Sequence, residues 1–520
     1  MAPDRTAQVY AGYSAITSMS DARSATHAME DLEGHIAPII YLSDISSLLS
    51  WDQQVIMPPA GTPARANQRA TISRVIYDRL TDDAVGSLLD ELDSASLEGD
   101  DAAIVREVRR QYERQVRVPG ELVETIKRTT AEAHPVWERA RQTDDFDRFA
   151  PKLEEIIELK REYAAHIDPD RPPYEVLFED YEPYLSLDVA DSILASLRDG
   201  LVPLIERIQT AEPGLALDAF DDVADVEQQE AASRAILDVL AFDWDRGRLD
   251  TSTHPFSSGT QFDARITTRY DESDLLSGLM ATIHEFGHAQ YGLGLSQDAY
   301  GTPLGEDRGL TVHESQSRFW ENHVGRSEAF WTFALPLLRE HIPWLDAVSK
   351  RDAYEAANQV YSDNLIRVEA DELTYHLHIV IRYEIERALI AGELDVEDVP
   401  TVWNDTYEDY LGVRPETDTE GCLQDIHWSS GSIGYFPTYS LGSVLAAQLH
   451  AAVERDIGAP EPNIRAGEFE PIANWHTTNI HAHGQRYTTP DLIEHATGET
   501  FSADAFLAYV EEKYTALYGL

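Results

Sequence analysis

Two histidines and a glutamate in the stretch His284 to His288, HEFGH, have the residue types and the spacing of a metal site. Histidines four residues apart lie on one face of a helix, so both imidazoles can bind one ion, and this geometry suits zinc. Glu285 is offset by roughly 100° around the helix, which places its carboxylate beside the ion, where a bound water would sit. The pattern predicts a hydrolytic centre with Glu285 as the general base.

The residues around this motif are typical of a helix that would hold it. Ser273 and Asp274 form a helix-start signal, and Gly292 and Gly294 provide the stop. Apolar residues recur between them at helical spacing, namely Leu275, Leu276, Leu279, Met280 and Ile283. Because chance matches to HExxH occur, the alternative interpretation is a pair of core histidines with ordinary hydrogen-bond partners.

A candidate third ligand lies on a second predicted helix. After the loop DAYGTPLGEDRG, the segment TVHESQSRFWENHVG begins a helix near His313 and Glu314. Glu314 follows His288 by 26 residues, which leaves room for a return loop and a helix packed on the first. Two histidines and a glutamate, with the fourth position left to water, form a known catalytic zinc arrangement. The alternative is structural, because Thr311 and Glu314 also match a capping box.

The elements that must position these residues are mostly helices. The pattern is helix after helix from about Asp31 to Ile208, and a further helix is expected from about Val226 to Phe242. Beyond the metal motif, a long helical region is expected from about Asp352 to Ile390, ending at Gly392. These patterns predict one large helical body.

A short strand is expected directly before the metal helix. Polar Asp263, Arg265, Thr267 and Arg269 alternate with Ala264, Ile266, Thr268 and Tyr270. The alternation predicts a small β-sheet next to the HExxH helix. Since no linker or change of composition divides the chain, we expect a single domain over residues 1–520. Its N-terminal helical part would cover about 1–250, and its metal and substrate-binding part about 251–520.

Composition restricts the partners and the ligands. The net charge of −52, from 93 acidic and 41 basic residues, would repel nucleic acid and anionic membranes. The single cysteine, Cys422, excludes intrachain disulfides and a cysteine-based zinc site. The N-terminus does not resemble a signal peptide, and no apolar run is long enough to cross a bilayer, so we expect a cytoplasmic protein. We interpret the dispersed acidic surface as a halophilic adaptation.

Six short motifs occur in order along the chain. They are HPF at His254, DxRxT at Asp263, HExxH at His284, HESQ at His313, IRxxAD at Ile366 and GxxQDxHW at Gly421. Together they resemble the carboxypeptidase Taq family of metallocarboxypeptidases, and the resemblance covers nearly the whole chain. HExxH alone identifies only a large class, whereas the six motifs together are highly specific.

The resemblance implies a mostly helical, elongated body with a deep groove, assembled as a homodimer. It implies removal of single C-terminal residues from peptides with broad specificity, with zinc as the metal and cobalt as a frequent substitute. By carry-over, His284, His288 and Glu314 are metal ligands and Glu285 is the catalytic base.

A carboxypeptidase must also recognise the free α-carboxylate of its substrate. The planar fork of arginine pairs bidentately with a carboxylate, and Arg265 and Arg367 lie in two of the motifs. The alternative for each is a structural salt bridge, with Asp263 or Asp371 as a possible partner.

The tetrahedral oxyanion needs a hydrogen-bond donor in addition to zinc. Candidates from the glycine-rich and aromatic stretch after Gly421 are His427, Tyr435 and Tyr439, each with a structural role as the alternative. Two other functions stay open. One is an oligopeptide endopeptidase of the HExxH class, and the other is a helical binding protein with a structural metal site. Glu285 argues against the second, because a structural site needs no base.

Overall fold

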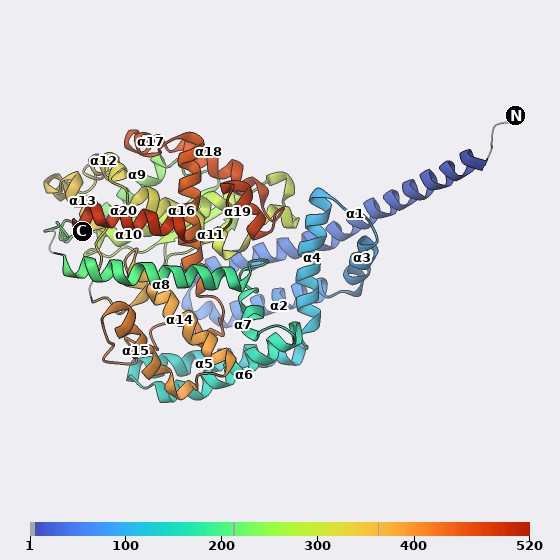
Figure 1. Cartoon of the computed structure of the whole chain (residues 1–520), viewed down its shortest axis with the longest axis horizontal. Helices are drawn as coiled ribbons and strands as arrows, with labels where there is room; N and C mark the ends of the chain where they lie inside the picture. Colours follow the sequence, from blue (N-terminus) through green and yellow to red (C-terminus); the bar gives the residue numbers. More distant parts are fainter. Residues whose placement is uncertain (1–5, 212–213, 362) are drawn as a thin grey trace.

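Helices dominate the molecule and form an elongated body from which the first helix projects (Figure 1). The structure is a computed structural model that describes residues 6–211, 214–361 and 363–520, with side chains from residue 25 onward. In this part of the chain no helix combines the length and the apolar character that a membrane span requires. The predicted mostly helical, elongated fold is confirmed.

The N-terminal part consists of helices, as the sequence predicts. They are α1 (Thr6–Val55), α2 (Thr62–Leu80), α3 (Asp83–Asp93), α4 (Gly99–Arg117), α5 (Gly120–Thr143), α6 (Phe146–Ile167), α7 (Pro173–Phe178), α8 (Leu187–Thr210) and α9 (Val226–Val239). Proline marks several of the starts, for example those of α2 and α5. Pro63 occupies the first turn of α2, and Pro119 directly precedes α5. A proline at these positions removes no hydrogen bond of the helix, because the first N–H groups of a helix have no acceptor within it.

A three-stranded sheet follows, and it contains two strands more than the one that the alternating pattern indicates. Its strands are β1 (Gly247–Thr251), β2 (Ser257–Thr260) and β3 (Asp263–Thr268), in the order β1-β3-β2. The central strand β3 pairs parallel with β1 and antiparallel with β2, so β2 is an edge strand. Ala264 and Ile266 of β3 are buried in the same core as helix α10, which confirms the predicted sheet beside the HExxH helix.

The C-terminal part is helical again. Its helices are α10 (Leu275–Gly294), α11 (Gly309–Arg318), α12 (Glu328–Leu338), α13 (Lys350–Ala357), α14 (Thr374–Ala391), α15 (Val399–Leu411), α16 (Pro437–Ile457), α17 (Glu461–Ala466), α18 (Glu470–Asn479), α19 (Thr489–Thr497) and α20 (Asp504–Tyr518). A π-helical turn, Phe319–Gly325, continues α11.

The long helical region expected from about Asp352 to Ile390 is interrupted, because it consists of two separate helices, α13 and α14. Between them the chain is irregular apart from the 3-10 turn Arg367–Glu369. Asp371 starts the second helix, since its Oδ1 accepts hydrogen bonds from the backbone N–H groups of Leu373 and Thr374. The predicted end is confirmed, because Gly392 follows α14 with a φ of 76°.

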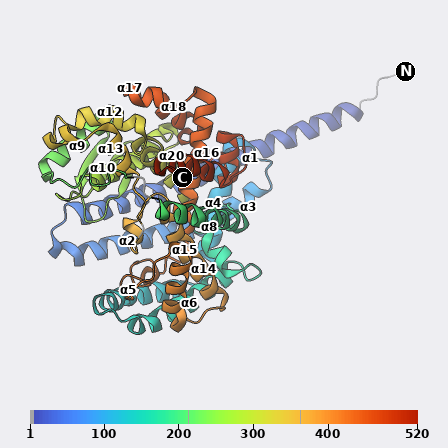
Figure 2. The same ribbon diagram turned by 60° about the vertical axis from the view of Figure 1, so that its left-hand side comes forward.

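Helix α16 joins the two large apolar cores. One core is built mainly from α5, α6, α8, α14, α15 and α20, and the other from the sheet and α9 to α12. In both views α5, α6, α14 and α15 lie in the lower part of the molecule, whereas α9 and α12 lie in the upper part (Figures 1 and 2). Leu441 and Val444 of α16 belong to the first core, whereas Leu445 and Leu449 belong to the second. Since α16 contributes buried residues to both cores, neither core is complete without this helix.

The net charge of −52 predicts that the fold depends on salt. Asp418 illustrates the cause, because its pKa is raised by burial and by the nearby carboxylates of Asp144, Asp147 and Asp145. Added salt shortens the Debye length from about 30 Å at 0.01 M to about 3 Å at 1 M, which screens such repulsion. We expect the melting temperature to rise steadily from millimolar to molar potassium chloride.

Thermal unfolding followed by circular dichroism measures this dependence. The double variant Asp144→Asn/Asp147→Asn removes two of the clustered charges and should gain less from added salt than the native chain. A melting temperature that is flat or falls over this range would show that the acidic surface is not a halophilic adaptation.

Candidate metal centre

Helix α10 presents the HEFGH motif in its middle. Its start is fixed by Asp274, whose side chain accepts a hydrogen bond from the Ser277 N–H, and it ends at Gly294, as predicted. His284 and His288 lie on one face, and their ring centroids are 4.9 Å apart. The predicted mid-helix position of the motif is therefore confirmed.

Two glycines allow helices to approach the metal motif closely. At Gly287 of α10, an added Cβ would lie 2.5 Å from the carbonyl oxygen of Gln316 in α11. At Gly442 of α16, an added Cβ would lie 2.5 Å from the Cβ of Glu314. Both distances are shorter than any normal van der Waals contact of a carbon atom. Glycine at these two positions lets α11 lie between α10 and α16, with Glu314 directed at the histidines.

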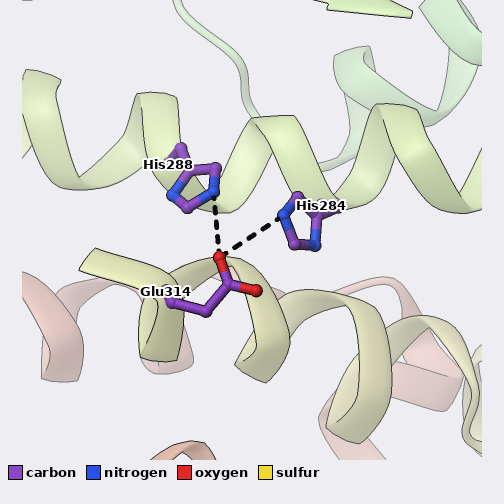
Figure 3. Close-up of side chains that lie close together, drawn as sticks. All are labelled: His284, His288 and Glu314. Atoms are coloured by element: carbon purple, nitrogen blue, oxygen red, sulfur yellow. Dashed lines mark ion pairs between the residues drawn. The ribbon is translucent and has the colours of Figure 1, made fainter. Parts of the chain in front are cut away.

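The side chains of His284, His288 and Glu314 converge from the two helices (Figure 3). Oε2 of Glu314 lies 3.7 Å from Nε2 of His284 and 3.5 Å from Nε2 of His288. A site for a metal ion is indicated by three or more His, Cys, Asp or Glu side chains whose candidate ligand atoms all lie within 4.8 Å of one another. In the described part of the chain, these three residues form the group that meets this criterion.

These distances fit a shared ion better than direct hydrogen bonds. Hydrogen bonds of this kind span roughly 2.7–3.2 Å, which is shorter than either separation. Tetrahedral zinc with bonds of about 2.0–2.2 Å holds its ligand atoms roughly 3.3–3.6 Å apart. The donor set of two imidazoles and one carboxylate, with its spacing, therefore fits a divalent metal ion.

The alternative role of Glu314 in a capping box is not realised. The hydrogen-bond acceptor at the N-terminus of α11 is Glu182, which lies far from this helix in the sequence. The N–H and the Oγ1 of Thr311 donate to Oε1 of Glu182 over 2.5 and 2.6 Å. Burial raises the pKa of Glu182 to about 8. Glu182 thus satisfies the helix end, and the carboxylate of Glu314 is available to the histidines.

Glu285 is buried beside this cluster. Its Oε2 has no hydrogen-bond partner among the described residues, and the side chain is 5% exposed. Burial raises its pKa to about 7, while the neighbouring His284 acts in the opposite direction. A carboxyl group that exchanges its proton near neutral pH suits general acid and base chemistry.

Two charged residues of the site, Arg318 and Glu321, were not found from the sequence. Oε2 of Glu321 lies 2.9 Å from Nδ1 of His284, so this carboxylate orients the ring that directs Nε2 at Glu314. Arg318 donates to Oε1 of Glu314 over 2.7 Å and to Oε2 of Glu321 over 3.0 Å. A sequence signal exists only for Arg318, which follows Glu314 by four residues within α11 and so shares its helix face.

A cavity of about 110 Å³ lies beside His288. It is bordered by the edge strand β2 and by His313, whose ring stacks on His288 at a centroid distance of 4.3 Å. Three carboxylates also line it, from Asp44, Glu306 and Asp307. The cavity gives small groups access to one side of the cluster.

Arg367 lies in a buried network next to the cluster. It donates to Oδ1 of Asp425 over 2.8 Å, and Arg382 donates to the other oxygen of the same carboxylate over 2.6 Å. Its guanidinium also faces the rings of Tyr375 and Tyr439, at 5.9 and 5.3 Å. The ion-pair partner is therefore Asp425, while the Asp371 considered from the sequence starts α14.

Arg265 occupies a different position. Its guanidinium pairs with Asp263 over 2.7 Å and stacks on Trp51 of α1 at 4.3 Å. Strand alternation directs both side chains away from the core face, which carries Ala264 and Ile266. This contact is the structural salt bridge that was the alternative for Arg265, and contact with substrate stays a prediction.

The three candidate donors to the oxyanion lie together in one aromatic cluster, formed by His427, Tyr435 and Tyr439. The two tyrosine rings have centroids 5.2 Å apart, and His427 lies 5.5 Å from Tyr435. The hydroxyl of Tyr439 lies 3.4 Å from Nε2 of His427. Tyr375 touches this cluster and also lies under Arg318, which binds Glu314, so the aromatic residues adjoin the metal cluster.

Comparison with known proteins gives one consistent result. The family model of the carboxypeptidase Taq (M32) metallopeptidases matches residues 31–514. Thermostable carboxypeptidase 1 of Thermus thermophilus is 41% identical over 493 residues, which cover 92% of this chain and 96% of that protein. Carboxypeptidase 1 of Bacillus subtilis is 36% identical over 486 residues, covering 93% and 97%. The crystal structure of an M32 carboxypeptidase from Deinococcus radiodurans superposes with a TM-score of 0.91 at 35% identity, covering 95% of this chain and 100% of that one.

Proposed function

The chain belongs to the carboxypeptidase Taq (M32) family of metallopeptidases and is a metal-dependent carboxypeptidase, and we propose that one zinc ion held by His284, His288 and Glu314 serves this activity. The observation that carries the assignment of ligands is the convergence of both Nε2 atoms on Oε2 of Glu314, at 3.7 and 3.5 Å. Cobalt can replace zinc in such a nitrogen and oxygen site. The products are single C-terminal amino acids released from peptides of varied sequence.

The residues around the ion have different roles in the proposed reaction. When bound, zinc polarises the scissile carbonyl and makes a water molecule acidic near neutral pH. Glu285 removes the proton of the attacking water at its carboxylate and passes it to the leaving amine. Tyr375 contacts Tyr439 and also lies under Arg318, which binds Glu314, so the aromatic cluster adjoins the metal cluster. We propose its members His427, Tyr435 and Tyr439 as donors to the oxyanion and to the substrate.

Recognition of a free C-terminus separates this proposal from an endopeptidase. We expect rapid hydrolysis of a peptide with a free α-carboxylate and almost none of the same peptide with a C-terminal amide, with loss of one residue at a time in mass spectra. Equal cleavage of both peptides would favour the endopeptidase alternative. A protein that binds zinc but cleaves neither would favour the binding-protein alternative.

The arginine substitutions test which residue binds the carboxylate. Arg367→Ala or Arg265→Ala should raise KM for free peptides by roughly 10- to 150-fold, because a charge-assisted pair contributes about 1.5–3 kcal/mol. At least one of the two should show this effect in steady-state kinetics. Arg207→Ala, which removes an exposed pair with Glu511, is the surface control. Unchanged KM in both variants would move the carboxylate site to other residues.

We propose that residues 1–520 act as one peptidase domain, and the burial of α16 in both cores supports this. Assembly as a homodimer and a cytoplasmic location stay predictions. Analytical ultracentrifugation at working salt concentration measures the assembly. A sedimentation coefficient of a single chain at micromolar protein would contradict the homodimer.

A further inference from the structure

Arg318 contacts two carboxylates that serve the metal cluster. Its Nε donates to Oε1 of Glu314 over 2.7 Å, and its Nη1 donates to Oε2 of Glu321 over 3.0 Å. The side chain is only 17% exposed, so these pairs are poorly screened by solvent. The Arg318 guanidinium therefore connects Glu314, a candidate metal ligand, with Glu321, the hydrogen-bond partner of the candidate ligand His284.

The two oxygens of Glu314 have different surroundings. Oε2 faces both histidines, at 3.7 and 3.5 Å, and accepts a hydrogen bond from the Ser317 hydroxyl at 3.2 Å. Oε1 points away from the histidines to Arg318. A carboxylate without such a partner can give both oxygens to one metal ion, which uses two coordination positions.

We propose that Arg318 is a positioning residue that restricts Glu314 to one ligand oxygen, Oε2, and so keeps a coordination position open for water and substrate. The inference rests on the proposed function, because it takes Glu314 as a ligand. Arg318 itself touches neither histidine in the described structure, so its effect on the ion passes through the two carboxylates.

The contact of Arg318 with Glu321 also affects the orientation of His284. Glu321 accepts from Nδ1 of His284 over 2.9 Å, which fixes the tautomer whose Nε2 lone pair is directed at the cluster. Glu321 is held by Arg318 on Oε2 and by Arg326 on Oε1, each over 3.0 Å. The orientations of His284 and Glu314 are thus coupled through Arg318.

Lysine does not substitute for this arginine on geometric grounds. The guanidinium addresses two carboxylates in two directions from one plane, and its face lies over the ring of Tyr375 at 4.9 Å. An ammonium group has neither the fixed fork nor the flat face. Arg318→Lys should therefore restore charge without restoring the restriction on Glu314.

The test uses the full chain loaded with zinc or cobalt, with Arg318→Gln and Arg318→Lys as variants. Arg326→Gln is the matched control, because it removes a cation from Glu321 and leaves the contact to Glu314 intact. Zinc affinity is measured by competition with a chromogenic chelator, and coordination by the visible absorption of the cobalt-loaded protein. Circular dichroism melting establishes that each variant is folded.

We expect Arg318→Gln to bind zinc about 10- to 100-fold more weakly, as is typical for loss of a group that orients metal ligands. Its cobalt bands should weaken, because a second oxygen of Glu314 raises the coordination number. Arg318→Lys should show the same spectral change with a smaller loss of affinity, and Arg326→Gln should keep the native spectrum.

Native affinity and native cobalt bands in folded Arg318→Gln would overturn the inference. If that variant does not fold, the spectrum of Arg318→Lys decides in the same way. Failure of the proposed site is a distinct result, because the native chain would then bind no stoichiometric ion at all.

Discussion

Replacement of Glu285 by glutamine is expected to lower kcat by at least about a hundredfold, since general bases typically contribute 10²–10⁴. Glutamine is nearly isosteric with glutamate, so it fits the same buried position, but it cannot accept the proton of the attacking water. The metal ligands are untouched. Zinc content should therefore stay at the native value while turnover is lost.

The measurement combines steady-state hydrolysis of a free peptide with metal analysis of the same preparation. Glu285→Asp is the matched control, because it keeps a carboxylate but withdraws it by one methylene, and it should retain more activity than Glu285→Gln. Retention of more than about a tenth of native kcat by Glu285→Gln would exclude the general-base role. Loss of zinc in that variant would show instead that the substitution disturbs the ligands.

The metal helix was predicted well because its signals are local. The start at Asp274, the apolar spacing and the glycines at its end all lie within one short segment, and α10 follows them. The position of Glu314 came from a chemical requirement for a third ligand, and the structure directs its carboxylate at both histidines. Prediction from the sequence succeeds where spacing along one helix determines the geometry.

Contacts between distant segments were not predictable in this way. Arg367 pairs with Asp425, 58 residues away, and no pattern in either segment indicates that partner. Strand β1 has only one buried residue, Leu249, so the alternation that identified β3 is missing. The break between α13 and α14 precedes Asp371, whose side chain starts a new helix within the helical region expected from Asp352 to Ile390.

The orienting residues of the metal centre were missed for a different reason. Arg318 is the last residue of α11, and Glu321 lies in the π-helical turn that follows. A π-helical turn advances less around the axis per residue than an α-helix, so positions beyond it cannot be assigned to a face from α-helical spacing. Such turns are frequent at functional sites, and here the turn directs Glu321 at His284.

Replacement of Glu314 by alanine should release most of the bound metal, because only two protein ligands then hold the ion. Loss of a residue that merely orients a ligand weakens binding 10- to 100-fold, so loss of a ligand should weaken it by more than about a hundredfold. Zinc content after dialysis should fall well below one ion per chain, and activity should return in part when excess zinc is added.

Glu182→Ala separates this effect from a loss of helix stability. Glu182, and not Glu314, receives the hydrogen bonds of Thr311 at the start of α11, so its removal should cost about 1 kcal/mol or more of stability while zinc stays bound. Glu314→Ala should instead lose the metal, so zinc content and not stability distinguishes the two variants. Native zinc content in folded Glu314→Ala would contradict its assignment as a ligand, and the two histidines would then need another partner to hold the ion.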